Sequence, residues 1–162
     1  MSGLEDLYRE IILDHYRSPR NRGELESPPA HRAEGFNPLC GDEIVVYVTV
    51  DDESAGTAAT IIDVKIGGQG CSISQASASM MSAAVKGKTL AEVADITRAF
   101  KAMMSIHENE LEGETGVPAE DAPDVALGDL EALRGVVKFP VRIKCATLSW
   151  NTLAQAADEL VS

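Results

Sequence analysis

Residues 37–42 are the stretch around which the sequence is organised, and they read Asn37-Pro38-Leu39-Cys40-Gly41-Asp42. Pro38 and Gly41 favour a sharp bend in the backbone. If residues 40–42 are extended, alternate side chains share one face, so Cys40 and Asp42 point in the same direction. A thiol and a carboxylate at this spacing are a suitable pair of ligands for one metal ion.

The chain contains two other cysteines, Cys71 and Cys145. Each stands where a helical pattern begins, so we expect both thiols at helix N-termini, where the macrodipole and the free backbone N–H groups favour the thiolate. Arg142 and Lys144 add positive charge beside Cys145, which favours its thiolate further. We hypothesise that three sulfurs and one carboxylate bind a single metal ion, with the ligands Cys40, Asp42, Cys71 and Cys145.

Other ligand sets remain open from the residues alone. Asp42 stands beside Gly41, so one alternative is that it only forms a turn and binds no metal. His31 or His107 could supply the fourth ligand instead, although neither has a ligand-like spacing to a cysteine. His15 lies on the apolar stripe of the first predicted helix, where a buried and hydrogen-bonded histidine is more common than a metal ligand.

The composition predicts a single globular domain over residues 1–162, with 44% hydrophobic residues and therefore a sizeable core. The formal net charge of −12 opposes binding to nucleic acid or to an anionic membrane, because the summed field repels polyanions. No apolar run approaches the roughly 20 residues of a membrane-spanning helix, and the N-terminal sequence lacks a secretion signal. We therefore expect a cytoplasmic protein with protein partners and reduced cysteines.

Strands are predicted at residues 43–50 and 59–66, which are rich in β-branched side chains and read as an antiparallel hairpin. A third extended segment is expected either just before Cys71 or ahead of Cys40. The sheet is therefore small.

Helical patterns cover residues 4–17, 72–87, 89–104 and 146–160. Capping-box patterns open three of these helices, with the pairs Ser2 and Glu5, Ser72 and Gln75, and Thr89 and Glu92. The methionines on the helices could form a soft metal-binding face, but their apolar neighbours favour core packing; they are Met80, Met81, Met103 and Met104. Trp150 is expected to pack on the last helix.

Two segments outside these elements have an unusual charge. Four arginines in or beside the loop between residues 18 and 36 concentrate positive charge: Arg17, Arg20, Arg22 and Arg32. They could mark a docking surface for an acidic partner, and the alternative is an ordinary solvated loop. Residues 108–131 contain nine acidic residues and no basic one, and glycines and prolines interrupt any periodicity. We predict an acidic, loop-like insertion there, with a short helix near residues 129–133.

Four motifs in this order resemble the U-type proteins of iron–sulfur cluster assembly, and the match is closest to their SufU branch. The motifs are Asp14-His15-Tyr16, residues 37–42, Gly70-Cys71-Ser72-Ile73-Ser74 and Phe139-Pro140-Val141-Arg142-Ile143-Lys144-Cys145-Ala146-Thr147-Leu148. The resemblance spans nearly the whole chain. It implies an α+β fold, in which helices pack mainly on one face of a small antiparallel sheet and the three cysteines and the aspartate meet at one end.

The resemblance also implies a function. Cys40, Asp42, Cys71 and Cys145 would bind Zn²⁺, and Cys40 would accept persulfide sulfur from a PLP-dependent cysteine desulfurase of the SufS type. Arg142 is expected near the site or at the partner interface. The protein would be a zinc-dependent sulfurtransferase that passes sulfur to the downstream iron–sulfur scaffold complex.

Two other functions compete with this one. The first is a non-enzymatic scaffold that binds iron or a labile [2Fe–2S] cluster, since an oxygen ligand holds a cluster less firmly than a thiolate. The IscU-like scaffolds carry a histidine immediately before the third cysteine and a Leu-Pro-Pro-Val-Lys signal upstream, whereas this chain has Lys144 and Phe139-Pro140-Val141-Arg142. The second is a structural zinc module, which a carboxylate ligand disfavours because such sites usually use Cys and His.

Overall fold

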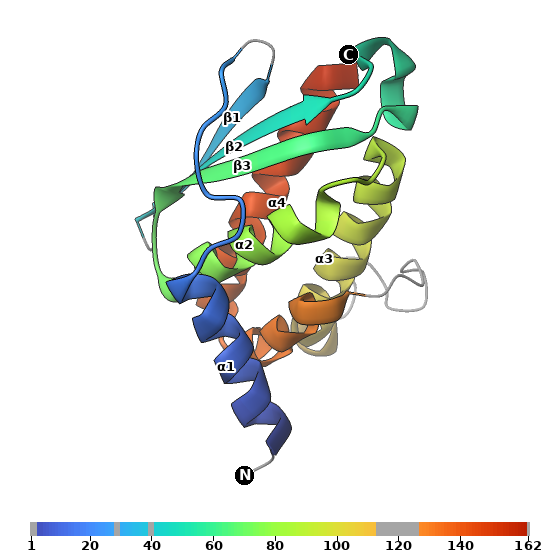
Figure 1. Cartoon of the computed structure of the whole chain (residues 1–162). Coiled ribbons are helices and arrows are strands. Elements are labelled where there is room, and N and C mark those ends of the chain that lie inside the picture. Colours follow the sequence, from blue (N-terminus) through green and yellow to red (C-terminus); the bar gives the residue numbers. More distant parts are fainter. Residues whose placement is uncertain (1–2, 28–29, 39–40, 113–126, 162) are drawn as a thin grey trace.

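The computed structural model describes residues 3–27, 30–38, 41–112 and 127–161. The elements in chain order are α1 (Gly3–Arg17), β1 (His31–Asn37), β2 (Asp42–Val50), η1 (Glu53–Ala58), β3 (Ile61–Gln69), α2 (Ser72–Val85), α3 (Leu90–Glu112), η3 (Gly128–Lys138) and α4 (Pro140–Val161). The three strands form one layer, and α4 and α2 pack against it (Figure 1). This is the predicted α+β fold with a small antiparallel sheet.

The sheet has the order β1-β2-β3, and both neighbouring pairs are antiparallel. The third strand is thus the segment ahead of Cys40, which was one of the two predicted positions. Asn37 pairs with Asp42 at the end of the β1–β2 ladder. Residues 38–41 therefore connect the two strands of a hairpin, and Cys40 itself lies outside the described residues.

Close packing of α4 on β1 and β2 carries the last cysteine toward this hairpin connection. Ile44, Val46 and Val48 of β2 are almost fully buried, as expected for a strand with one face on the core. A Cβ atom at Gly35 of β1 would clash with the hydroxyl of Thr152 on α4. The absence of a side chain at this position lets the helix lie directly against the strand.

The helices form the second layer of the core around an aromatic pair. Trp150 of α4 is fully buried and stacks on Phe100 of α3 with 4.8 Å between the ring centroids. The four helical methionines are also buried, so their prediction as core residues is confirmed.

The starts of the helices confirm one predicted capping box, contradict another and correct the predicted start of the last helix; Ser2 of the first predicted box lies outside the described residues. Glu92 donates its backbone N–H to the hydroxyl of Thr89 at 3.1 Å and accepts the Thr89 N–H at 3.0 Å, which is the predicted capping box. The predicted Ser72 cap is wrong, because Cys71 occupies the N-cap of α2. The predicted helix start at Cys145 is also wrong: α4 begins at Pro140, a residue suited to the first helical position, and Cys145 lies in its second turn.

The acidic segment was expected to be irregular from residue 108. Instead α3 continues to Glu112, and a 3₁₀ helix starts at Gly128 and covers the short helix expected at residues 129–133. Residues 113–126, the remainder of the predicted insertion, lie outside the described residues.

Candidate metal centre

Three of the four predicted ligands meet at the end of the sheet. The ligand atoms of Asp42, Cys71 and Cys145 all lie within 4.8 Å of one another. Asp42 and Cys145 are fully buried, and Cys71 is half-buried. The fourth predicted ligand, Cys40, falls outside the described residues, so the structure does not bear on its position.

The strand register explains why Asp42 and Cys71 meet. Asp42 begins β2, and its neighbour Glu43 pairs with Gln69 near the end of antiparallel β3. The chain then needs only one more residue, Gly70, to bring Cys71 beside Asp42. A Cβ atom at Gly70 would lie 2.5 Å from Oδ1 of Asp42, so the close approach requires glycine here.

Hydrogen bonds hold both oxygens of the Asp42 carboxylate. Oδ1 accepts the backbone N–H of Cys71 at 2.9 Å, and Oδ2 accepts the side-chain amide of Asn37 at 3.3 Å. The same amide nitrogen lies 3.7 Å from Sγ of Cys145. Asn37 belongs to the motif at residues 37–42 but was not among the predicted ligands; its position directly before Pro38 was the available signal.

Cys71 and Arg142 form the more exposed side of the group. Sγ of Cys71 accepts the backbone N–H of Ser74 at 3.5 Å as the cap of α2. The negative charge of the Cys71 sulfur and its hydrogen bond to the guanidinium raise the pKa of Arg142, and Cys145 contributes a smaller effect. A cation therefore stands beside two sulfurs of the group.

Cys71 and Arg142 also line a groove of about 1070 Å³ at the surface. Its walls are largely apolar, and their residues come from α1, α2, η3 and the start of α4. Two residues around the start of α4 are strongly exposed: Phe139 exposes 62% of its surface and Val141 exposes 59%. A large partner or substrate can therefore reach the Cys71 side of the group without opening the core.

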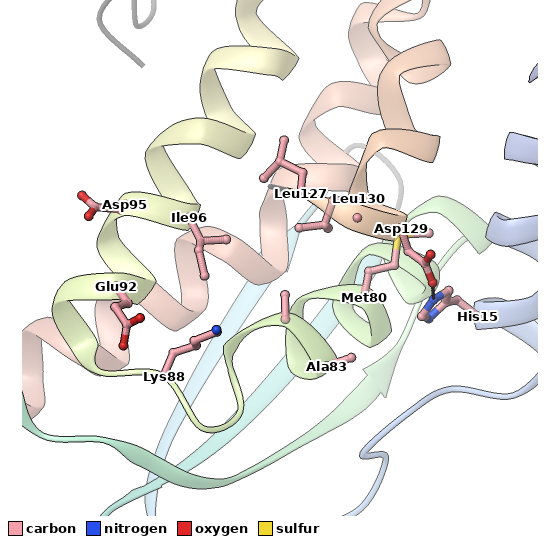
Figure 2. A pocket seen from close by; sticks show the side chains of 12 residues that line it. His15, Met80, Ala83, Lys88, Glu92, Asp95, Ile96, Leu127, Asp129 and Leu130 are labelled. Carbon is pink, nitrogen blue, oxygen red and sulfur yellow. Dashed lines mark hydrogen bonds and ion pairs between the residues drawn. The ribbon is translucent and has the colours of Figure 1, made fainter. Parts of the chain in front are cut away.

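His15 and His31 do not join the described ligand group. His15 is buried, with Nδ1 2.8 Å from the Ser79 hydroxyl and Nε2 2.9 Å from Oδ2 of Asp129. Figure 2 shows this contact with Asp129 at the edge of a separate cavity of about 590 Å³. His31 contacts Glu159, and the side chain of His107 lies outside the described part of the chain. The interpretation of His15 as a satisfied buried histidine is confirmed.

The arginines of the early loop are largely engaged within the chain. Arg20 pairs with Asp14 at 2.6 Å, and Arg32 pairs with Glu34 at 2.7 Å. Arg22 donates to the side chain of Gln75 and to a β3 carbonyl. The two ion pairs reduce the positive charge that the expected acidic docking partner would meet, whereas the neutral acceptors of Arg22 leave its charge in place.

The donor set fits a zinc ion. Zn²⁺ accepts thiolate sulfur and carboxylate oxygen, and sulfur atoms around a tetrahedral ion lie roughly 3.8 Å apart for a Zn–S distance of about 2.3 Å. The separations within the group are compatible with that spacing. Three described donors leave one position of a tetrahedron for a further ligand.

Comparisons with known proteins agree with this picture. A family model described as the NifU-like N terminal domain matches residues 7–146. The chain is 43% identical to the zinc-dependent sulfurtransferase SufU of Bacillus subtilis, over 94% of this chain and 90% of the relative. It is 38% identical to an iron-sulfur cluster assembly scaffold protein IscU of Streptococcus pyogenes, over 96% of this chain and 86% of the relative.

Solved structures show the same fold. One is a putative iron-sulfur cluster assembly scaffold protein for the SUF system from Fervidobacterium islandicum, with a TM-score of 0.73 and 32% identity, covering 96% of this chain and 99% of that structure. A nitrogen-fixing NifU-like protein from Brucella abortus aligns with a TM-score of 0.74 over 98% of this chain and 97% of that structure, at 25% identity. None of the helices in the described residues has the length and apolar character needed to cross a membrane.

Proposed function

Because the chain belongs to the family of NifU-like N-terminal domains, we propose that it is a zinc-dependent sulfurtransferase of iron–sulfur cluster assembly. In this function Cys40 accepts persulfide sulfur from a PLP-dependent cysteine desulfurase of the SufS type. The sulfur then passes to the cluster-building machinery in the cytoplasm. The observation that carries the proposal is the convergence of Asp42, Cys71 and Cys145 at the hairpin connection that contains Cys40.

The proposed ligand set is Cys40, Asp42, Cys71 and Cys145. The chain connectivity supports Cys40 as a ligand. Cys40 is two positions from Asp42, and two residues of extended chain span at most about 7 Å, so Cys40 must lie near the group. Zinc bound there would keep thiolates deprotonated at neutral pH without any redox chemistry of its own.

Sulfur transfer would proceed by thiol exchange. The Cys40 thiolate attacks the terminal sulfur of the desulfurase persulfide, and a new S–S bond forms to Cys40. The old S–S bond breaks, and the desulfurase cysteine leaves as a thiolate. No oxidant is consumed, because the transferred sulfur atom keeps its oxidation state. Arg142 contributes a cation beside the sulfurs that attracts the anionic persulfide.

The groove beside Cys71 gives the desulfurase a route to the site. A persulfide on a flexible loop of the partner must come within bonding distance of the acceptor sulfur, and a site closed on every side would prevent this. The half-buried state of Cys71, in contrast to the buried Cys145, marks the approach side.

The experiment combines metal analysis with desulfurase turnover. We expect the isolated protein to be colourless, to contain one zinc ion per chain, and to stimulate alanine release by a cysteine desulfurase. Cys40→Ala should abolish this stimulation and the appearance of a persulfide detected by mass spectrometry. Unimpaired stimulation by Cys40→Ala would refute the acceptor assignment.

A scaffold for a labile [2Fe–2S] cluster is the second candidate. The observation that favours it is the carboxylate in the ligand group, since Asp42 would hold a cluster less firmly than a fourth thiolate and so ease its transfer. Relatives named as IscU scaffolds also match most of the chain. A brown, iron-containing protein that leaves desulfurase turnover unchanged would select this function.

A further inference from the structure

We propose that Asn37 is a positioning residue of the metal centre, whose side-chain amide holds Asp42 and Cys145 together before an ion binds. The inference rests on the proposed function in one respect, namely that this group binds a metal. It assigns a role to a residue outside the ligand set. It also explains how a strand and a distant helix present their donors at a common point.

Asn37 occupies a position from which it reaches both ligands. It is the last residue of β1, it is 6% exposed, and its backbone pairs with Asp42 across the ladder. Its Nδ2 atom lies 3.3 Å from Oδ2 of Asp42 and 3.7 Å from Sγ of Cys145. An amide nitrogen carries two hydrogens, so one side chain can donate to both acceptors at once.

The chemistry of the partners determines the orientation of the amide. A carboxylate only accepts hydrogen bonds, and Oδ2 of Asp42 is the nearer of the two partners. The amide oxygen of Asn37 would repel the carboxylate if it faced it. The nitrogen must therefore point toward Asp42 and Cys145, which removes the usual ambiguity between the two ends of an asparagine side chain.

These contacts join all three described ligands into one chain of hydrogen bonds. The backbone N–H of Cys71 donates to Oδ1 of Asp42, and Asn37 links Oδ2 to Cys145. The ligands come from three separate elements, α2, β2 and α4. Asn37 is the side chain that connects the α4 ligand to the β2 ligand in this arrangement.

A neutral amide suits this task better than a cation. An ionised carboxylate is costly to bury in a medium of low dielectric, and N–H donors reduce that cost. Arg142 stands as an exposed cation beside the sulfurs, whereas the buried amide of Asn37 adds no positive charge and leaves the charge of the carboxylate available to attract Zn²⁺. An ionised carboxylate has about four lone-pair sites, so the two hydrogen bonds leave sites free for a metal.

Partners that orient the ligands of a metal site commonly contribute about 10–100-fold to metal affinity. We therefore expect Asn37→Ala to weaken zinc binding by about 10–100-fold, measured on the full chain by competition with a chromophoric chelator. Asn37→Leu keeps most of the side-chain volume but has no donor, so it should weaken zinc binding to the same extent. Wild-type affinity in Asn37→Leu would overturn the proposal, because shape and not hydrogen bonding would then hold the ligands.

The control is Thr97→Val, which removes one buried hydrogen bond to the Val93 carbonyl of α3, an element that supplies none of the three ligands. It should keep the wild-type zinc affinity. Cobalt(II) substitution gives a readout that stability does not affect: the visible spectrum should change in both Asn37 variants and stay unchanged in Thr97→Val. An unchanged cobalt spectrum in the Asn37 variants would contradict the positioning role.

Three outcomes separate an effect on folding from an effect on function. If both Asn37 variants are unfolded without metal while Thr97→Val is folded, Asn37 holds the hairpin and the proposal is overturned. If the wild-type protein binds no zinc, the proposed function fails. If all variants bind zinc as tightly as the wild type, only this inference fails and the proposed function stands.

Discussion

The backbone N–H of Cys71 donates a 2.9 Å hydrogen bond to the carboxylate of Asp42, although 29 positions separate the two residues in the chain. The bond joins the first residue of β2 to the cap of α2. Asp42 is thus both a candidate ligand and the acceptor that fixes the start of a helix. The spacing of the metal group consequently depends on the β2–β3 register.

Asp42→Ala should damage both functions of this carboxylate. The substitution leaves the Cys71 N–H and the Asn37 amide without their acceptor in a buried setting, which typically costs about 1–3 kcal/mol of unfolding free energy. It also removes one donor from the metal group. Urea unfolding of the metal-free protein and a zinc-binding titration measure the two losses.

The matched control is Asp52→Ala, which removes an exposed aspartate that also accepts a backbone N–H, that of Ser54. Zinc affinity should not change in this variant. Equal zinc affinity in Asp42→Ala and the wild type would exclude Asp42 from the ligand set.

Gly70→Ala tests the close approach of β3 to Asp42. The added Cβ atom would stand 2.5 Å from Oδ1, so the carboxylate must move and the hydrogen bond to Cys71 must lengthen. We expect zinc affinity to fall by at least about 10-fold, the lower range for a disturbed ligand setting.

Gly135→Ala is the control for this change, because a Cβ atom at that position of η3 meets nothing within 4 Å. Isothermal titration with zinc should give the wild-type affinity. If Gly70→Ala also binds zinc normally, the carboxylate of Asp42 can shift without leaving the site.

His15→Ala should destabilise the protein without affecting zinc directly. The imidazole joins α1 to Ser79 of α2 and to Asp129 of η3 (Figure 2). Its loss removes two hydrogen bonds and leaves a buried gap, for which we expect about 1–3 kcal/mol. Urea unfolding of the zinc-loaded protein measures the change.

His31→Ala removes a histidine whose contact, with Glu159, is more exposed, and we expect a smaller effect. Comparable losses in the two variants would show that His15 does not hold the three elements together.

Arg142→Gln should slow sulfur acceptance while zinc remains bound. The guanidinium is exposed and lies beside Cys71 and Cys145, so its charge can attract an anionic persulfide, and removal of such a charge typically lowers the association rate and its salt dependence. Desulfurase turnover at low and high ionic strength gives the measurement, with Arg98→Gln on α3 as the control. The prediction fails if both variants show the same salt dependence as the wild type.

Several features of this protein were determined by local sequence. The capping box of Thr89 and Glu92, the end of α1 at Arg17 and the β-branched runs of β2 and β3 all appear as predicted. Each depends on residues within a few positions of one another, and side-chain periodicity and capping chemistry act over that range. The ligand types were readable for the same reason, because a thiol or a carboxylate keeps its chemistry in any fold.

The tertiary structure decided how these parts meet. Pairing across the sheet made the segment ahead of Cys40 the third strand. Packing of α4 on β1 brought Cys145, in the second turn of that helix, beside Asp42. The Asn37 side chain contacts Cys145 across 108 positions of the sequence, and His15 contacts Asp129 across 114. Such contacts follow from strand register and helix packing, which depend on the whole core at once, so no single segment of sequence contains them.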